Sequence, residues 1–232
     1  MKRIIATLLM LLMLLSLCAC GKSESEIRGQ VSDVAETPAE EEPAEEAVEE
    51  EAAEAQVGSV TGGRYESSFL GIGCELDENW VYASQEEMAE LLGVTADMFE
   101  DESYAEAMKN ADMFYDMYAI VADGTTSINV LVQNLGLIYG TVLSEEEYVE
   151  LSTKDLQAQL ESAGFTGISW EQTTIDFAGE QRVGLKISST VQGVAYYCTQ
   201  AYIKSGSHIA VVTLASYFED VTEDLADYFF AV

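Results

Sequence analysis

Histidine, proline and basic residues are scarce in this chain. Among 232 residues it has one histidine, two prolines and ten lysines and arginines, against 42 aspartates and glutamates. A single histidine cannot build a histidine-rich zinc site, and the C-x-x-C and H-E-x-x-H motifs are both absent from the sequence. Nucleic acid is excluded as a partner, because phosphate binding requires clustered lysines and arginines. We therefore expect no metal site, no cofactor and no nucleic-acid surface.

The chain also lacks a recognisable catalytic constellation. Cys198 is the cysteine that precedes the lone histidine, His208. A hairpin turn predicted at 205–206 would separate these two side chains by about 17 Å, at about 3.4 Å per strand residue. A serine triad is not supported, since no G-x-S-x-G elbow is present. We expect His208 at the surface beside the turn and a protein that is not an enzyme, with an unrecognised hydrolase as the remote alternative.

The N-terminal residues have the three parts of a secretory signal. Two basic residues precede an apolar run at 4–17, and small residues follow it. Leu17, Ala19 and Cys20 resemble the lipobox of bacterial lipoproteins. The resemblance implies that residues 1–19 are removed, that Cys20 is lipidated, and that the protein is extracytoplasmic and anchored to the cell membrane. A retained transmembrane helix is the alternative, but the apolar run would span only about 21 Å of a hydrocarbon core about 30 Å thick.

The residues between the lipobox and the main domain are acidic and poor in apolar side chains. Residues 21–63 hold 13 of the 42 acidic residues, only two bases and no aromatic residue. Such a segment cannot bury enough apolar surface to offset its ordering entropy. A helix at 44–56 is the competing interpretation, but its glutamates would repel one another four residues apart. We predict that residues 20–63 form a disordered tether with an r.m.s. reach of about 35 Å.

Residues 64–232 are predicted to form one α+β domain. Ser84 with Glu87 and Ser144 with Glu147 match the capping box of a helix N-terminus. Asp123-Gly124 between two apolar runs predicts a hairpin. Strands are expected at 65–69, 72–76, 113–122, 127–134, 168–177, 181–190, 194–204 and 207–216, and helices at 85–92, from 95, at 145–163 and at 222–230. Runs of strands with helices at both ends favour an antiparallel sheet that is flanked by helices.

This order of elements is similar to that of the PsbP-like family. The likeness rests on a glycine-flanked opening strand that runs into Asp77-Glu78-Asn79-Trp80, and on the helix near the C-terminus. The resemblance implies an α/β/α sandwich and a binding or assembly factor without catalysis, because most members are of that kind and several are lipoproteins. It transfers no functional residues to this chain.

Two cysteines lie inside the predicted domain, Cys74 and Cys198. Export would favour a disulfide between them if the fold made them neighbours, and closing so long a loop would contribute roughly 4–5 kcal/mol in the chain-entropy model. The alternative is two buried free thiols, each packing as a small hydrophobic side chain. The sequence leaves both alternatives open.

An apolar segment at 134–143 is the strongest candidate for a binding surface. It lies where a polar connection is expected, immediately before a predicted helix. Either its side chains pack beneath that helix, or they form an exposed patch of the kind that marks a partner or ligand surface. The candidate patch comprises Trp80, Leu135, Leu137, Ile138 and Tyr139. The leading hypothesis is a module that binds another envelope protein, and a small-molecule-binding lipoprotein is the alternative.

Overall fold

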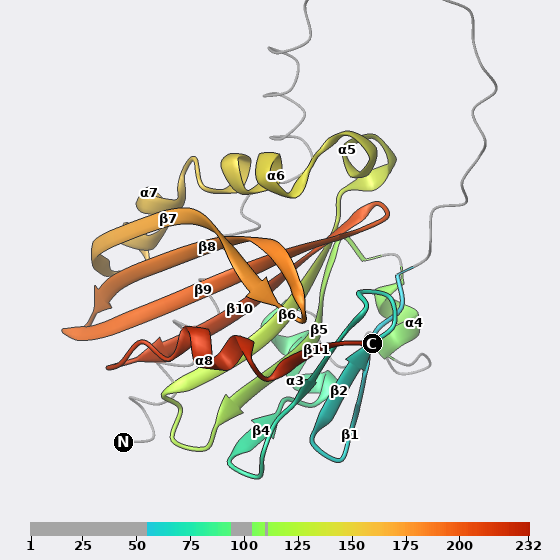
Figure 1. Ribbon diagram of the computed structural model, residues 1–232, viewed down its shortest axis with the longest axis horizontal. Helices are drawn as coiled ribbons and strands as arrows, with labels where there is room; N and C mark the ends of the chain where they lie inside the picture. Colours follow the sequence, from blue (N-terminus) through green and yellow to red (C-terminus); the bar gives the residue numbers. More distant parts are fainter. Residues whose placement is uncertain (1–54, 94–103, 110) are drawn as a thin grey trace, which may run out of the picture.

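Two antiparallel β-sheets build the domain, as the computed structural model shows (Figure 1). The structure describes residues 55–93, 104–109 and 111–232. Cys20, the signal-like segment, most of the predicted tether and the helix predicted from residue 95 lie outside these ranges. Within them, no helix is long and apolar enough to cross a membrane.

The smaller sheet has four strands and joins the beginning of the described chain to its end. Its order is β1 (Ser59–Thr61), β2 (Arg64–Ser67), β3 (Ile72–Glu75) and β11 (Phe229–Ala231). Strand β11 pairs with β3 and places Phe229 opposite Cys74. The sequence predicted a helix through these last residues, and the helix instead stops at Ala226. Pairing with a strand more than 150 residues earlier overrides the local helical pattern.

The larger sheet has seven strands and contains the predicted meander. Its order is β4 (Trp80–Tyr82), β5 (Met113–Val121), β6 (Thr126–Asn134), β10 (His208–Tyr217), β9 (Val194–Ser205), β8 (Glu180–Val191) and β7 (Phe165–Phe177). The turn between β5 and β6 uses Asp123 as predicted, since its Oδ1 accepts a hydrogen bond from the Thr125 amide at 2.9 Å. The α+β class predicted from the sequence is confirmed, and its strands form two sheets rather than one.

Six helices are described, and all are short. They are α3 (Gln85–Leu91), α4 (Tyr104–Met108), α5 (Gly136–Val142), α6 (Glu145–Ser152), α7 (Leu156–Ser162) and α8 (Thr222–Ala226). Both predicted capping boxes are formed, at Ser84 with Glu87 and at Ser144 with Glu147. The single helix predicted at 145–163 is divided in two. The Thr153 hydroxyl donates to the Val149 carbonyl at 2.7 Å, a local bond that competes with continuation of the helix.

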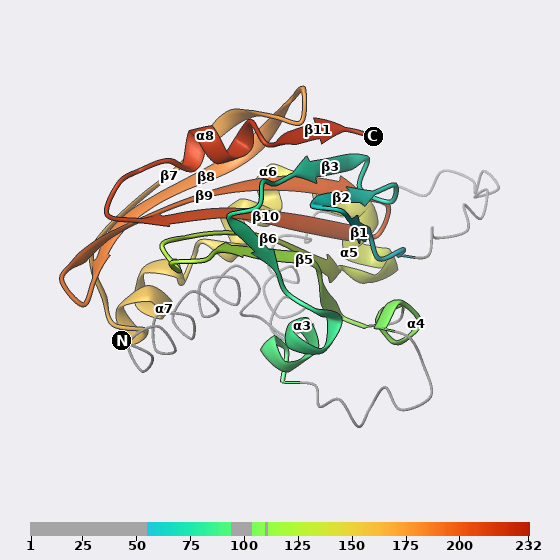
Figure 2. The ribbon, with the colours of Figure 1, turned by 90° about the horizontal axis from the view of Figure 1, so that it is seen from below.

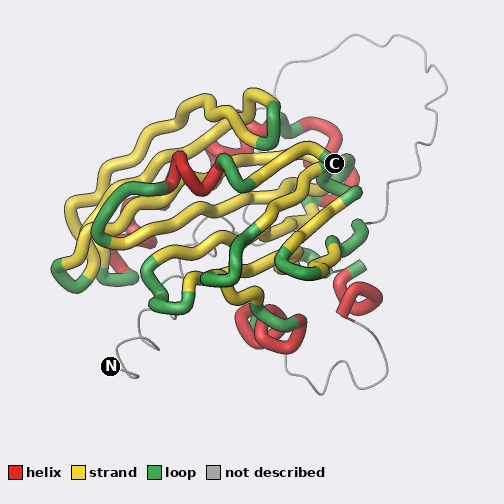
Figure 3. The backbone as a smooth tube through the Cα atoms, turned by 60° about the horizontal axis from the view of Figure 1, so that its bottom comes forward, coloured by secondary structure: helices red, strands yellow, loops and turns green. Residues whose placement is uncertain are grey.

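Different elements cover the two faces of the larger sheet (Figure 2). The smaller sheet and α8 lie on one face, whereas α3, α4 and α7 lie on the other. Figure 3 shows the strands as a curved layer with α8 in front of it. Buried residues accordingly form two clusters, one between the sheets that extends under α3 and α4, and one beneath α6 and α7.

The folded part includes residues that the sequence assigned to the tether. Ala55 is buried against the core between the sheets. Strand β1, which precedes the predicted domain boundary at residue 64, pairs with β2. The Gly58 amide donates a hydrogen bond to Asp116 of β5. Composition marked residues 55–63 as tether because they contain few large apolar side chains, yet backbone hydrogen bonds hold them to the sheet.

Candidate interaction surface

Helix α5 occupies the apolar segment in which the sequence predicted a connection. It begins where β6 ends, and Asn134 Oδ1 accepts a hydrogen bond from the Gly136 amide at 2.8 Å. The Leu135 amide donates to the Ser207 carbonyl at 2.8 Å, which ties the start of the helix to the turn between β9 and β10. Glycine and β-branched residues are poor helix formers, so their abundance here explains why the sequence pattern did not predict this helix.

The inner side of α5, which we define as Leu135, Tyr139 and Gly140, packs against the domain. Leu135 is buried and Tyr139 is partly buried against the cluster beneath α6 and α7. A Cβ atom at Gly140 would lie 2.4 Å from the Ser207 Cα atom, so no other residue fits there without a shift of the backbone. Glycine is therefore what allows the helix to approach the β9–β10 turn closely.

The outer side of α5, which we define as Leu137, Ile138 and Val142, faces solvent. These side chains are 71%, 73% and 68% exposed. The other large exposed apolar residues of the described chain are distributed over β1, β4, β7 and the C-terminal segments, whereas three come from this single helix. Single exposed apolar residues are normal on a protein surface, but a group on one element is less common, so the outer side of α5 is the candidate interaction surface.

Acidic residues follow this apolar surface directly along the chain. Helix α6 carries Glu145, Glu146 and Glu147 in its first turn, and the last two are exposed. The two neighbouring bases are already engaged by this part of the chain. Lys204 donates from Nζ to the Leu143 carbonyl at 2.6 Å, and Arg182 lies 3.9 Å from Glu145. An apolar partner surface edged with positive charge would complement this arrangement.

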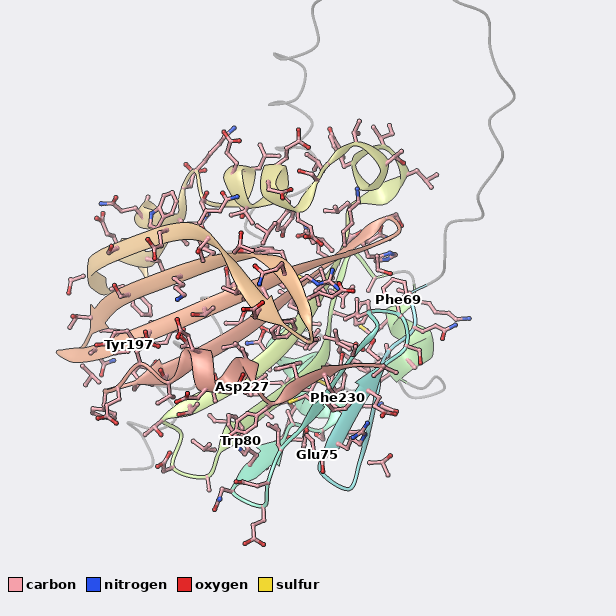
Figure 4. The ribbon with its side chains drawn as sticks, viewed as in Figure 1. Phe69, Glu75, Trp80, Tyr197, Asp227 and Phe230 are labelled. Carbon is pink, nitrogen blue, oxygen red and sulfur yellow. The ribbon has the colours of Figure 1, made fainter. Side chains whose placement is uncertain are left out.

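The residues of the predicted patch do not lie together. Leu137 and Ile138 are exposed on α5, whereas Leu135 is buried and Tyr139 only partly exposed. Trp80 is half-buried on β4, at the opposite end of the molecule from α5 (Figure 1), and its ring meets that of Tyr228 edge-on at 6.2 Å. Figure 4 shows Trp80 beside the small sheet, not far from Glu75. The structure therefore removes Trp80 from the candidate surface and adds Val142.

Asp116 is a buried carboxylate that the sequence analysis overlooked. It lies at a β-bulge in β5, where the register with β6 shifts between Tyr115 and Met117. Its two oxygens accept hydrogen bonds from the Tyr65 hydroxyl and the Gly58 amide, both at 2.5 Å. Burial raises the pKa of Asp116, and these hydrogen bonds partly oppose that shift. The sequence did offer a signal for this site, because Asp116 is the single charged residue in the otherwise apolar strand β5.

Asp116 and its two hydrogen-bond partners connect the two sheets. Tyr65 belongs to β2 of the smaller sheet, and its own pKa is raised well above the ordinary value by burial and by the carboxylate. Both hydrogen-bond partners are themselves within or beside the packed interior. The arrangement satisfies a buried polar group that would otherwise be costly, so its role is to fix the position of one sheet on the other.

His208 is buried rather than exposed beside the turn, contrary to the prediction. Only 4% of it is accessible, because the Phe69 ring meets the imidazole edge-on at 5.4 Å. Burial lowers the pKa of His208. Cys198 lies opposite Ala215, seven positions along β10 from His208, so the two cannot interact. No group of three or more histidine, cysteine, aspartate or glutamate side chains suited to a metal occurs among the described residues.

Cys74 and Cys198 are both free and buried in the structure. Cys74 belongs to the cluster between the sheets and Cys198 to the cluster beneath α6 and α7. Of the two alternatives left open by the sequence, the structure has the pair of free thiols and not the disulfide. Burial raises the pKa of each thiol to about 12, so neither is an activated nucleophile.

The chain has distant likenesses to solved structures. No protein-family model and no curated protein matches the chain. Among solved structures, LpqN, described as involved in cell envelope biogenesis of Mycobacterium tuberculosis, is 10% identical over 68% of this chain and 82% of LpqN, with a TM-score of 0.37. A protein of unknown function from Pseudomonas aeruginosa is 16% identical over 45% of this chain and 66% of its own, with a TM-score of 0.27. Likenesses at these TM-scores carry no functional argument.

Proposed function

We propose that this chain is a non-enzymatic, protein-binding lipoprotein of the cell envelope, and that the outer side of α5 is its docking anchor. Residues 1–19 serve as the signal peptide, Cys20 carries the lipid, and the acidic segment that follows holds the domain away from the membrane. The PsbP-like resemblance of the sequence supports a binding or assembly role. The partner is another protein of the envelope.

The exposure of Leu137, Ile138 and Val142 is the observation that carries this proposal. Each of these apolar side chains remains exposed to water in the folded domain. Full burial of such a side chain, here against a partner, is worth about 1.5–3 kcal/mol. Three of them on one helix supply a compact apolar contact, and the buried core of a protein interface is more apolar than its rim. The inner side of the same helix fixes it rigidly, so docking needs no large rearrangement of the backbone.

Charge determines which partner surface fits. Residues 64–232 carry 29 acidic residues, which is 42 minus the 13 in residues 21–63, and only six bases. Such a domain attracts a basic surface and repels an anionic lipid headgroup layer. The acidic start of α6 next to α5 orients the partner, while the apolar side chains of α5 supply the affinity.

Site-specific photocross-linking in cells tests the docking surface. A photoreactive amino acid at position 138 should capture one recurrent envelope protein, and the capture should disappear when Leu137→Ser and Val142→Ser are introduced in the same chain. The matched control places the photoreactive group at Val81, which is 56% exposed on β4 at the other end of the molecule. Position 81 should not capture that protein.

Three results would contradict parts of the proposal. Equal capture from positions 138 and 81 would mean that α5 is not the docking site. Capture of lipid instead of protein at 138 would assign the helix to the membrane surface. Absence of any capture, together with a small molecule retained in native mass spectrometry of the full chain, would favour the ligand-binding alternative. Separately, the Cys20→Ser variant should lose the mass of the lipid and be released from the membrane.

A further inference from the structure

The long edge strand of the larger sheet differs from every other sheet edge that is described. The smaller sheet ends in β1 and β11, and the larger sheet ends in β4, each with three residues. The remaining edge, β7, has 13 residues. Proteins usually protect sheet edges with short strands, lysine, proline or covering elements, because an uncovered edge offers unpaired backbone groups to another chain.

Within the part of the chain that the structure describes, protection of β7 is confined to its two ends. Only Phe165 and Phe177, its first and last residues, are buried. A register shift separates Thr166 from Ser169, and beyond Ile175 the strand passes into the hairpin that packs Phe177 against Phe229 at 4.5 Å between ring centroids. The residues between these ends pair regularly with β8 and form the segment that we call the open edge, Ser169–Thr174.

No proline or lysine occurs in the open edge, and its side chains are largely exposed. In an antiparallel sheet, alternate residues direct their N–H and C=O groups toward opposite neighbours. Every second residue of the open edge therefore directs its backbone hydrogen-bonding groups away from β8. Trp170, which is 42% exposed opposite the buried Ile187, adds a large apolar surface beside these groups.

We propose that the open edge of β7 binds an extended, basic segment of another polypeptide, which adds to the larger sheet as an eighth strand. Its backbone would supply the hydrogen bonds, with an apolar side chain beside Trp170 on one face and a basic side chain beside Glu171 on the other. The residue opposite Glu171 on β8, Lys186, forms its ion pair with Glu223 at 2.6 Å. This surface is independent of the docking function proposed for α5.

The charge of the chain decides among the occupants of this edge. Residues 21–54 contain the same 13 acidic residues as the whole segment 21–63, so the chain's own N-terminal part would be repelled by Glu171 and by the acidic domain. A second copy would bring an equal acidic domain and its own Glu171 to the edge. A segment with lysine or arginine at alternate positions gains from the same field.

Binding of a synthetic strand to the full chain in detergent micelles tests the proposal. The probe is a nine-residue peptide of alternating lysine and valine, and the protein carries Trp80→Phe so that Trp170 is its one tryptophan. Binding should change the Trp170 emission and slow amide exchange in the open edge. A peptide of identical charge with N-methyl groups on alternate residues should bind at least about tenfold more weakly, because it cannot supply the backbone hydrogen bonds.

Two proline variants at neighbouring positions provide the matched control, Gln172→Pro and Thr173→Pro. Because adjacent residues direct their N–H groups to opposite sides, one variant should lose a bond to β8 and unfold more easily, while the other should retain stability and lose the peptide. Equal affinity for the two peptides, or full binding by the stable proline variant, would overturn the proposal. Self-association that replaces peptide binding and is abolished by the stable proline variant would assign the edge to a second copy and also overturn it.

Discussion

The interior around Asp116 and the outer side of α5 both hold side chains in unusual environments, but the two regions differ in whether the fold compensates them. Asp116 is a charged residue in a buried position, and it receives hydrogen bonds from Tyr65 and Gly58 at 2.5 Å. Leu137 and Ile138 are apolar residues in exposed positions, and no neighbour among the described residues removes them from water. The first group is compensated inside the fold, whereas the second group remains exposed to solvent, which is why we propose it as a docking surface.

This difference separates stability from function. A residue that is compensated within the domain should affect folding when it is changed, because its partners lose their hydrogen bonds or contacts. A residue that the fold does not use should be replaceable without loss of stability, and its effect should be seen in binding. The following substitutions test whether the two regions behave in these opposite ways.

The largest effect is expected at Asp116. The Asp116→Ala substitution leaves the Tyr65 hydroxyl and the Gly58 amide without acceptors in the interior, which should lower the free energy of unfolding by about 2–4 kcal/mol. Urea denaturation followed by far-UV circular dichroism measures this change. The control is Asp112→Ala, at the exposed residue immediately before the same strand, with an expected change within about 0.5 kcal/mol. Equal effects of the two substitutions would remove the structural role assigned to Asp116.

Gly140 should show the next largest effect, since it belongs to the inner side of α5. A Cβ atom there would approach the Ser207 backbone to 2.4 Å, so Gly140→Ala should lower the free energy of unfolding by about 1–3 kcal/mol despite the higher helix propensity of alanine. Thr141→Ala, one residue further along the helix and exposed, serves as the control. A stabilising Gly140→Ala would mean that α5 does not pack against the β9–β10 turn.

His208 is a second buried polar residue, and it should make the free energy of unfolding depend on pH. Burial lowers its pKa from the ordinary value of 6.5, so the unfolded chain binds a proton that the folded chain does not. This contribution to stability is fully present above about pH 6.5, the ordinary pKa of the unfolded chain, and is lost as the pH falls further through the lowered pKa of His208 in the folded chain. Unfolding free energies measured between about pH 7 and pH 5 should therefore fall more steeply for the natural chain than for His208→Gln. Parallel curves would show that His208 titrates normally in the fold.

Local signals predicted much of the fold. The capping boxes at Ser84 and Ser144 and the turn at Asp123-Gly124 each require only residues close together in sequence, and all three form. The meander strands also begin and end within a few residues of their predicted positions, because apolar and β-branched residues alternate with turn residues there.

The remaining features depend on contacts between residues far apart in sequence. Strand β11 exists because it pairs with β3, and α5 exists because its inner side fits against Ser207 and the neighbouring cluster. The candidate surface was predicted in part for the same reason. Composition identified an apolar segment, but only the packing distinguishes exposed Leu137 and Ile138 from buried Leu135, and only the topology separates them from Trp80.

The central claim is that folding does not use the outer side of α5, and paired alanine substitutions on the two sides of this helix test it most directly. The free energy of unfolding should change by no more than about 0.5 kcal/mol for the double substitution Leu137→Ala and Ile138→Ala. The inner substitution Leu135→Ala should lower it by about 2–5 kcal/mol, as expected for a buried leucine. An outer substitution as destabilising as the inner one would show that Leu137 and Ile138 belong to the core, and the docking surface would have to be abandoned.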